Sequence, residues 1–438
     1  MGFYLLSNMN TQINELYDLF LKHRKVSTDS RQIDRGSLFF ALKGEHFDGN
    51  KFAEEALEKG AAYAIVDDPN VAVKPGVLLT GNVLETLQEL AILHRKHIKM
   101  PVIGITGTNG KTTTKELVYA VLSTRYKTFA TSGNLNNHIG LPISILNIRE
   151  SDELAVIELG ANHIGEIAFL CSIADPDFGL ITNVGKAHLE GFGSFEGVVK
   201  AKTELYHYLQ NKNGVVFVNN EDRLLMEYSS GLKTITYGEE AGSDCRFELV
   251  SEFPGLAIDW HTASGTIKIN SSLYGEYNFH NINAAICIGN HFKISPEQVK
   301  AGIDSYVPRN QRSELIRSKK NTIYMDAYNA NPTSMELALK NFQRVPESKK
   351  MLILGDMLEL GDNADEEHLR IVSLIKALSF DNVFYVGPLF SRVLDDDKNV
   401  FPDVTQAVKW FESAPPSGYA ILIKGSRKIE LEKFLDIL

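Results

Sequence analysis

A glycine-rich loop with a single lysine carries the residues best suited to chemistry in this chain. It spans residues 104–113, reads GITGTNGKTT, and continues directly from the apolar run of residues 102–105. Backbone N–H groups curled at the start of a helix, together with one ammonium and one hydroxyl, form a phosphate cradle. We therefore expect Lys111 to reach the terminal phosphates of a nucleotide and Thr112 to ligate Mg²⁺.

The loop departs from the strict phosphate-loop pattern at one position. The pattern requires a glycine five residues before Gly110, where Ile105 stands, although the GTNGKT core is intact. Glycine-rich turns between a strand and a helix also occur without phosphate, so a purely structural loop is an open alternative at this point. The helix-like segment 112–122 directly after Lys111 favours phosphate binding.

Three further residues could act beside this loop. The apolar run 154–158 ends in Glu158, and a carboxylate at the end of such a strand can hold Mg²⁺. His188 follows the next apolar run, at the strand end where doubly wound sheets bind ligands. Each has an ordinary alternative, because many strands end in an acid and a single histidine is more often structural. Lys202, on the helix-like segment 195–209, would from composition alone be a solvated lysine.

Amide side chains are dense in two segments, 131–140 and 274–285. The first contains Asn134, Asn136 and Asn137. Amides suit neutral hydrogen bonds to a polar substrate, but turn formation explains asparagine equally well. Both interpretations stay open on the sequence alone.

Composition limits the class of protein. A hydrophobic content of 44% and a charged content of 23% are typical of a soluble globular protein, and no apolar run approaches the roughly 18 residues that cross a bilayer. The net charge of -10 argues against a nucleic-acid surface. The first residues lack the features of a signal peptide, so we expect a cytoplasmic protein. The cysteines have no paired spacing and are expected to be buried packing residues: Cys171, Cys245 and Cys287.

At 438 residues the chain should form several domains, and the order of predicted elements indicates three in an α/β class. Residues 1–98 combine an amphipathic helix over 13–23 with short strands over 37–42 and 62–66, which predicts a small α/β domain. The basic and polar stretch 94–100 is expected to be a linker.

The second predicted domain, residues 99–306, resembles a phosphate-loop ATPase with a mostly parallel sheet, because its apolar runs have the length of strands covered on both faces. Alternating residues over 244–272 predict an antiparallel patch. The third domain, residues 307–438, has apolar runs about one helix apart, as a Rossmann-like domain requires. Those runs are 351–355, 383–387 and 420–424.

Taken together, these motifs resemble those of the Mur ligases, the ATP-dependent amide-forming enzymes of peptidoglycan precursor synthesis, over essentially the whole chain. The family's own loop reads GTNGKT, so the resemblance accounts for the isoleucine. It implies two Mg²⁺ sites, with ligands Thr112, Glu158, His188 and Lys202. Lys202 matches the lysine that the family carbamylates with CO2, which turns it into an anion. The implied catalytic residues are Lys111, Glu158, His188 and Lys202.

The resemblance also implies the ATP contacts. Asn278 and Asn281 match the family's Asn-x-x-Asn near adenine, although Tyr277 replaces the more usual histidine before it. Arg312, Asp326 and Asn329 are expected to reach the nucleotide from the third domain. The implied phosphate contacts are Gly107, Thr108, Asn109, Gly110, Lys111, Thr112 and Thr113.

Particular segments point to one branch of the family. Residues 28–31, 36–44 and 47–49 resemble the uridine-nucleotide domain shared by the tripeptide-forming and the D-alanyl-D-alanine-adding ligases. Residues 326–332 and 354–361 resemble the latter branch, and KGSR at 424–427 also fits. The tripeptide-forming ligases and the folylpolyglutamate synthetases carry histidine where Asn329 stands. The implied substrate contacts are Thr28, Ser30, Arg31, Gly44, Asp48, Asn134, Asn137, Tyr328 and Asn331.

This resemblance implies joining D-alanyl-D-alanine to UDP-N-acetylmuramoyl-tripeptide through an acyl phosphate, a step that supports cell shape and division. A monomer is expected, with no nucleic-acid partner. Three alternatives are open: another amide ligase such as folylpolyglutamate synthetase, a GTPase-class switch, and a catalytically silent binding protein. The Asn-Lys-x-Asp motif that reads guanine is absent, which disfavours the switch.

Overall fold

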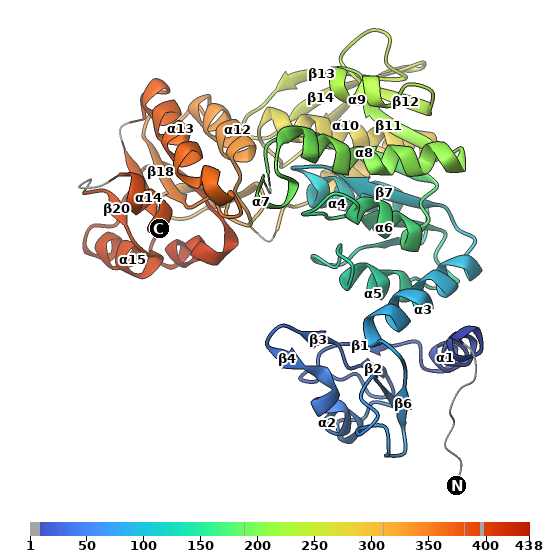
Figure 1. Cartoon of the computed structure of the whole chain (residues 1–438). Coiled ribbons are helices and arrows are strands. Elements are labelled where there is room, and N and C mark those ends of the chain that lie inside the picture. Colours follow the sequence, from blue (N-terminus) through green and yellow to red (C-terminus); the bar gives the residue numbers. More distant parts are fainter. Residues whose placement is uncertain (1–8, 188, 310, 381, 395–397) are drawn as a thin grey trace. The chain divides into compact units, whose positions relative to one another are not determined.

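The structure is a computed structural model, shown in Figure 1, and it describes residues 9–187, 189–309, 311–380, 382–394 and 398–438. Contacts divide the chain into two compact units. One holds the residues up to Gly104 with Tyr126–Ala161 and Glu166–Phe178, and the other holds Ile105–Arg125, Asn162–Gly165 and Gly179–Leu438.

The N-terminal part is a small α/β arrangement, as predicted. Four parallel strands lie in the order β1-β2-β5-β6, and the hairpin of β3 and β4 forms a separate two-stranded sheet. Phe39 and Ala64, paired across β2 and β5, belong to one buried cluster with Ala53 of α2. The elements are α1 (Met9–His23), β1 (Val26–Ser27), β2 (Leu38–Phe40), β3 (Lys43–Gly44), β4 (Phe47–Asp48), α2 (Ala53–Glu58), β5 (Tyr63–Val66), β6 (Val77–Leu79) and α3 (Val83–His97).

The predicted linker at 94–100 is wrong, because α3 continues through His97 and its last turn is partly buried. His94 is 1% exposed, and its ring bonds to the Ile148 carbonyl at 3.0 Å. The Arg95 guanidinium donates to the carbonyls of Ile98, Ala174 and Asp175 at 2.8 to 2.9 Å. His94 and Arg95 are therefore held by hydrogen bonds to residues about 50 to 80 positions away in the sequence, and the basic stretch is packed and not a solvated linker.

The central sheet has nine strands in the order β15-β14-β13-β12-β11-β10-β7-β9-β8. Strands β7 and β9 are buried along their whole length, which explains their continuous apolar sequence. The strands are β7 (Val102–Thr106), β8 (Thr128–Ala130), β9 (Leu154–Glu158), β10 (Phe178–Ile181), β11 (Val215–Asn219), β12 (Lys233–Gly238), β13 (Cys245–Ser251), β14 (Ala257–Thr262) and β15 (Gly265–Asn270).

The predicted antiparallel patch is confirmed as β13, β14 and β15. Its strands alternate because one face is buried, with Phe247 opposite Trp260 and Ile258 opposite Ile269. The patch joins the rest of the sheet through a short parallel pairing of β13 with β12.

Two helices of this region begin at recognisable capping residues. Ser295 and Gln298 form a capping box at α11, and Ser194 caps α8. The helices are α4 (Lys111–Leu122), α5 (Gly140–Leu146), α6 (Glu166–Ala174), α7 (Leu189–Phe192), α8 (Phe195–Lys212), α9 (Arg223–Tyr228), α10 (Glu276–His291) and α11 (Pro296–Ser305).

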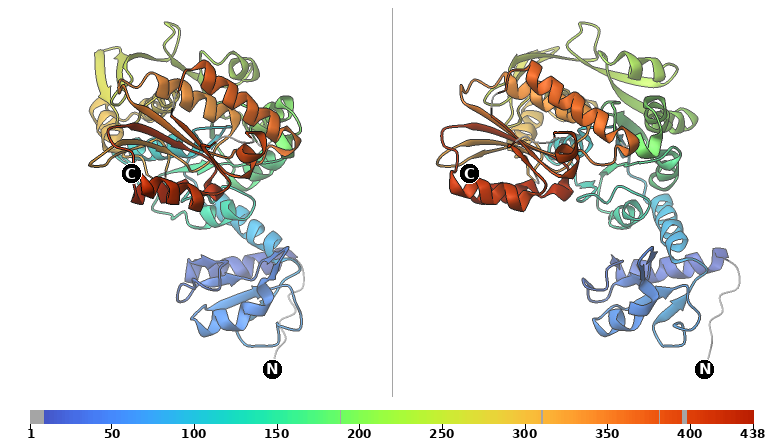
Figure 2. Two further views of the ribbon diagram at one scale, coloured as in Figure 1. Left: turned by 90° about the vertical axis from the view of Figure 1, so that its left-hand side faces the viewer. Right: turned by 60° about the vertical axis from the view of Figure 1, so that its left-hand side comes forward.

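The C-terminal part is the predicted Rossmann-like layer arrangement, with strands in the order β16-β17-β21-β18-β19-β20. Figure 2 shows helices on both sides of this sheet. The elements are β16 (Glu314–Arg317), β17 (Thr322–Asp326), α12 (Pro332–Gln343), β18 (Lys350–Gly355), α13 (Ala364–Ala377), β19 (Val383–Val386), α14 (Pro388–Val393), β20 (Val400–Phe401), α15 (Val404–Ser413) and β21 (Ala420–Lys424).

Successive strand residues of this sheet feed two separate cores. Tyr324 and Leu422 pack with Leu339 of α12, whereas their neighbours Ile323 and Ile421 belong to the other core with α15. Side chains alternate across a strand, so two apolar faces require helices on both sides. This is the arrangement that leaves the carboxyl ends of β17, β18 and β21 clear for loops.

Two expectations from composition can be compared with the structure. All three cysteines are buried free thiols, which confirms that they are packing residues. Among the described residues, no helix combines the length and apolar character needed to span a bilayer.

We predict that Arg95→Ala lowers the free energy of unfolding by roughly 2 to 4 kcal/mol, because buried carbonyls lose their charged donor. Chemical denaturation followed by circular dichroism would measure the effect. Lys96→Ala, on the exposed side of the same helix, is the matched control and should change stability little. Equal effects of the two substitutions would contradict the packed helix end.

Candidate active site

The loop between β7 and α4 requires glycine at two positions. Gly107 has φ +143°, and a Cβ there would lie 2.0 Å from the Thr182 hydroxyl oxygen. Gly110 is the N-cap of α4 with φ +80°, and a Cβ there would lie 2.6 Å from the Asn281 amide oxygen. Only glycine fits such backbone angles and such close approach at low cost.

The residues directly after β10 brace this loop. Thr108 N–H donates to the Asn183 carbonyl at 2.9 Å, and Asn109 N–H donates to the Asn183 side-chain oxygen at 3.0 Å. The Thr182 hydroxyl donates to the Asn109 carbonyl at 2.6 Å. The N–H groups at the start of α4 have no partner within the helix itself, so the braced loop aims them as anion donors.

Lys111 lies against its own loop. Its ammonium donates to the carbonyls of Gly107 at 2.8 Å and Thr108 at 3.0 Å. Thr112 and Thr113 follow in the first turn of α4, each only 6% exposed. The helix start, one ammonium and the hydroxyl of Thr112 are thus gathered as a phosphate cradle requires.

Asn278 and Asn281, the predicted adenine contacts, are buried in a chain of hydrogen bonds. The Thr114 hydroxyl donates to Asn281 at 3.0 Å, Asn281 donates to Asn278 at 3.0 Å, and Asn278 donates to the Ser313 hydroxyl at 3.1 Å. In this structure the two amides link α4 to α10 and to the start of the third domain. An adenine role for them stays a prediction.

Tyr277, where the family resemblance led us to expect histidine, also bonds to the Ser313 hydroxyl, at 3.0 Å. Burial raises the pKa of this tyrosine. Gln311 and Ser313 both have positive φ, +59° and +48°, on either side of Arg312. The Arg312 guanidinium carbon lies 3.6 Å from the centre of the Tyr328 ring. The chain is therefore bent sharply where it presents this arginine.

Glu158 lies at the end of β9 and is 2% exposed. Its Oε1 accepts from Asn136 Nδ2 at 2.7 Å, and its backbone N–H donates to the Thr131 hydroxyl. Its Oε2 is buried without a hydrogen-bond partner among the residues that the structure describes. Such an oxygen costs free energy unless a donor or cation meets it, which fits an oxygen ligand for Mg²⁺.

Lys202 is 2% exposed within α8, and its ammonium lies 5.3 Å from the centre of the Phe192 ring. The solvated alternative for this lysine is therefore wrong. His188 lies outside the described residues. Within the described ranges, no group of three His, Cys, Asp or Glu side chains could hold a metal ion. The predicted ligand set does not require such a group, because Glu158 is its one member of these residue types besides His188.

The third domain contributes a second group of polar residues at strand ends. Lys424 is 1% exposed and donates to Asp326 at 2.6 Å, across adjacent strands β21 and β17. Asn329 accepts from the Ala330 N–H within its own turn. Asn331 caps α12 and donates to the Asn109 side-chain oxygen at 2.8 Å, so it directly contacts the phosphate loop.

The predicted substrate residues of the N-terminal part lie in the segment 28–31, between β1 and β2, and at the ends of β3 and β4. Arg31 donates to both oxygens of Asp29, and this hydrogen bonding lowers the pKa of Asp29 to about 2. Asp48 caps a short turn by accepting from the Asn50 N–H, and a Cβ added at Gly44 would lie 2.3 Å from the Phe47 ring. Thr28 and Ser30 are half-buried beside them. Their contact with a substrate stays a prediction.

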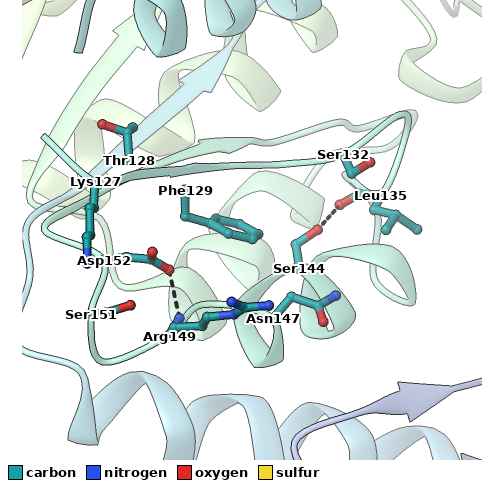
Figure 3. Close-up of a pocket in the computed structure, with 10 residues that line it drawn as sticks. All are labelled: Lys127, Thr128, Phe129, Ser132, Leu135, Ser144, Asn147, Arg149, Ser151 and Asp152. Atoms are coloured by element: carbon teal, nitrogen blue, oxygen red, sulfur yellow. Dashed lines mark hydrogen bonds between the residues drawn. The ribbon is translucent and has the colours of Figure 1, made fainter. Parts of the chain in front are cut away.

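A cavity of about 580 Å³ lies next to the amide-rich loop (Figure 3). Ser132 and Leu135 of that loop line it together with Phe129 and Arg149. Within the loop, the Asn137 side chain accepts from the Ile139 and Gly140 N–H groups and so makes a turn. Asn134 is exposed. Both the turn and the substrate interpretation of these amides therefore stay open.

Three family models match the chain in order. They are described as "Mur ligase family, catalytic domain" over residues 23–103, "Mur ligase middle domain" over 105–289 and "Mur ligase, glutamate ligase domain" over 311–427. A Bacillus subtilis relative described as a UDP-N-acetylmuramoyl-tripeptide--D-alanyl-D-alanine ligase is 37% identical, covering 98% of this chain and 95% of the relative. The chain belongs to the Mur ligase family.

Solved Mur ligases have the same fold. MurF from Acinetobacter baumannii is 31% identical with a TM-score of 0.84, covering 94% of this chain and 92% of that one. MurF from Thermotoga maritima in complex with ADP is 28% identical with a TM-score of 0.84, covering 96% and 97%. The family, the three-domain organisation and the α/β fold that the motifs predicted are thus confirmed.

Sequence reasoning missed several residues that shape this Mur ligase site. Thr182 and Asn183 brace the phosphate loop, and their signal was a polar pair directly after a buried strand. Asp356 is fully buried and accepts from the Leu389 and Phe390 N–H groups, and burial raises the pKa of its carboxyl. Its carbonyl also accepts from the Ser426 N–H, which ties two loops together. No local pattern reveals such a bond.

We predict that Gly107→Ala weakens binding of a non-hydrolysable ATP analogue at least about tenfold, because the added Cβ displaces Thr182 and the loop. Isothermal titration would measure the affinity. Gly242→Ala, where an added Cβ meets nothing within 4 Å, is the matched control and should bind normally. Unchanged affinity in Gly107→Ala would remove this loop from the nucleotide site.

Proposed function

We propose that this chain uses ATP to join D-alanyl-D-alanine to UDP-N-acetylmuramoyl-tripeptide, giving the UDP-linked pentapeptide precursor of peptidoglycan, ADP and phosphate. The observation that carries the proposal is its likeness, over 98% of its length, to a relative described by that reaction. The braced phosphate loop supports the use of ATP, as does the likeness to a MurF solved with ADP.

The proposed chemistry follows from the poor reactivity of a carboxylate. A carboxylate oxygen of the tripeptide attacks the γ-phosphorus of ATP, the bond to ADP breaks, and an acyl phosphate forms. The dipeptide's ammonium loses one proton, and the resulting amine nitrogen attacks the acyl carbon. The bond from that carbon to the phosphate oxygen breaks, and the nitrogen gives up a second proton, which the departing phosphate takes. Phosphate is a far better leaving group than hydroxide, which is why activation precedes amide formation.

The protein's main task in this proposal is to position anions and neutralise their charge. The start of α4 and the ammonium of Lys111 supply positive potential at the phosphate cradle. The acyl phosphate must be kept from water. The bonds from Asn331 to Asn109 and from the Lys186 N–H to Thr333 support a role of the third domain in covering the loop.

The Mg²⁺ ligands in this proposal are those that the family resemblance implies: Thr112, Glu158, His188 and Lys202. The buried, unpartnered Oε2 of Glu158 supports this set among the described residues. When bound, Mg²⁺ would neutralise phosphate oxygens and polarise the reacting phosphoryl group.

The proposal includes a carbamate on Lys202, formed when the neutral amine adds to CO2 and loses a proton. The burial of Lys202 supports this, because at 2% exposure it does not serve as an ordinary solvated lysine. A carbamate gives the side chain two oxygens that share one negative charge, and oxygen is the donor type that Mg²⁺ prefers.

The remaining assignments are part of the same proposal. Residues 1–98 would bind the uridine nucleotide through Thr28, Ser30, Arg31, Gly44 and Asp48. Residues 99–306 would bind ATP, with Asn278 and Asn281 near adenine and Asn134 and Asn137 on the substrate. Residues 307–438 would complete the ATP site with Arg312, Asp326 and Asn329 and bind the dipeptide near Tyr328 and Asn331. We also propose a cytoplasmic monomer.

We expect phosphate release only when ATP, UDP-N-acetylmuramoyl-tripeptide and D-alanyl-D-alanine are all present. A coupled phosphate assay across nucleotide-peptide and amine pairs measures this, and mass spectrometry identifies the product. Glutamate with a folate acceptor tests the folylpolyglutamate alternative, and GTP in place of ATP tests a GTPase. Release driven equally well by single D-alanine would refute the choice of amine.

Lys202→Ala should lose at least about 99% of the ligase activity, and excess bicarbonate should fail to restore it. Lys200→Ala, exposed on the same helix, is the matched control and should remain active. A carbamate carbon signal should appear in the NMR spectrum of wild-type protein supplied with ¹³C-bicarbonate and be missing in Lys202→Ala. Full activity of that variant would remove the carbamate from the mechanism.

A further inference from the structure

The Tyr328 ring holds two guanidinium groups. The guanidinium carbon of Arg312 lies 3.6 Å from the ring centre, and that of Arg427 lies 5.3 Å from it. Neither arginine forms an ion pair with a carboxylate among the described residues. An aromatic face attracts each cation modestly, but two like charges at one ring repel each other. The arrangement therefore favours an anion that is not part of the chain.

The neighbouring cation of the same loop is already neutralised. Lys424 is 1% exposed and pairs with Asp326 at 2.6 Å. Arg427, three residues later, is exposed. Within the KGSR segment, Arg427 is therefore the cation that an external anion can reach.

The loop that carries Arg427 is rigidly placed. A Cβ on Gly425 would lie 2.8 Å from the Cα of Gly355, so the ends of β21 and β18 are in close contact. Ser426 N–H donates to the Asp356 carbonyl at 3.0 Å, and the Ser426 hydroxyl accepts from the Leu358 N–H at 3.0 Å. Arg427 thus starts from a fixed backbone at the carboxyl ends of parallel strands, where such sheets bind ligands.

We infer that Arg427, held beside Tyr328, binds the C-terminal carboxylate of the dipeptide that supplies the amine, an inference that rests on the proposed function. A guanidinium matches a carboxylate with two parallel hydrogen bonds. The dipeptide's carboxylate takes no part in the reaction, so a fixed partner for it orients the reacting amine. The tyrosine ring offers apolar surface to the alanine methyl groups. Arg312, on the same ring, is assigned to the nucleotide in the proposed function.

A phosphate oxygen of the nucleotide is the other anion that Arg427 could meet, and kinetics separate the two. The test compares D-alanyl-D-alanine with its neutral C-terminal amide in wild type, Arg427→Ala, Arg427→Lys and Lys428→Ala. Lys428→Ala is the matched control, because it removes the exposed cation that follows Arg427 in the sequence. Phosphate release and the mass of the product are measured while dipeptide and ATP are varied separately.

Wild type should prefer the dipeptide acid over the amide by roughly 10- to 100-fold in kcat/KM, as expected for loss of a charge-assisted hydrogen bond. Arg427→Ala should raise the KM for the dipeptide by a similar factor, abolish the preference for the acid, and leave the KM for ATP within about twofold. Arg427→Lys should keep part of the preference for the acid, because the lysine ammonium keeps the positive charge but cannot form the two parallel hydrogen bonds of a guanidinium. Lys428→Ala should match wild type.

Three results would overturn the inference. Wild type using the amide as well as the acid would exclude a carboxylate site, whatever the variants do. A raised KM for ATP in Arg427→Ala with unchanged dipeptide kinetics would assign the residue to a nucleotide phosphate. An unchanged acid preference in that variant would remove Arg427 from the site. If wild type joined neither the dipeptide acid nor its C-terminal amide to the nucleotide-peptide, that result would refute the proposed function itself, and the inference with it.

Discussion

The candidate site depends on one close approach, between Gly107 and Thr182. The loop backbone can pass this close to the end of β10 only without a Cβ, and the bonds from Thr182 and Asn183 then hold it there. These bonds use the backbone groups of Thr108 and Asn109, which precede α4. The N–H groups at the start of α4 can then donate to an anion. The position of Lys111 follows from the same bonds, because its ammonium lies on the carbonyls of Gly107 and Thr108.

The third domain also gathers charged side chains at the ends of its strands. Its strands supply two cores by simple alternation, and helices on both faces leave the carboxyl ends of β17, β18 and β21 to the loops. Asp326 neutralises the charge of the buried Lys424. The guanidinium groups of Arg312 and Arg427 both lie near the Tyr328 ring. Close backbone packing of Gly425 against Gly355 fixes the loop that carries Arg427.

Sequence patterns predicted most of this fold because strands such as β7, β9 and β21 are short, apolar and buried on both faces, and because the phosphate loop is a local motif. They failed where distant residues decide the environment. The sequence predicted a solvated linker at 94–100, but in the structure Arg95 donates to the carbonyls of Ala174 and Asp175, which are far away in the sequence. Lys202 looked ordinary because burial leaves no trace in spacing. The bonds of Asn278 and Asn281 also join segments far apart in the sequence, so no motif reports them.

The antiparallel patch ends the nine-stranded sheet at β15, and among the described residues β14 is the one strand that pairs with it. A free strand edge can template pairing with another chain, and charged side chains on such a strand oppose this. Lys268 stands in the middle of β15, opposite Asp259 of β14, and most residues around it are solvent-accessible. This short charged strand would discourage fibrillar aggregation through that edge.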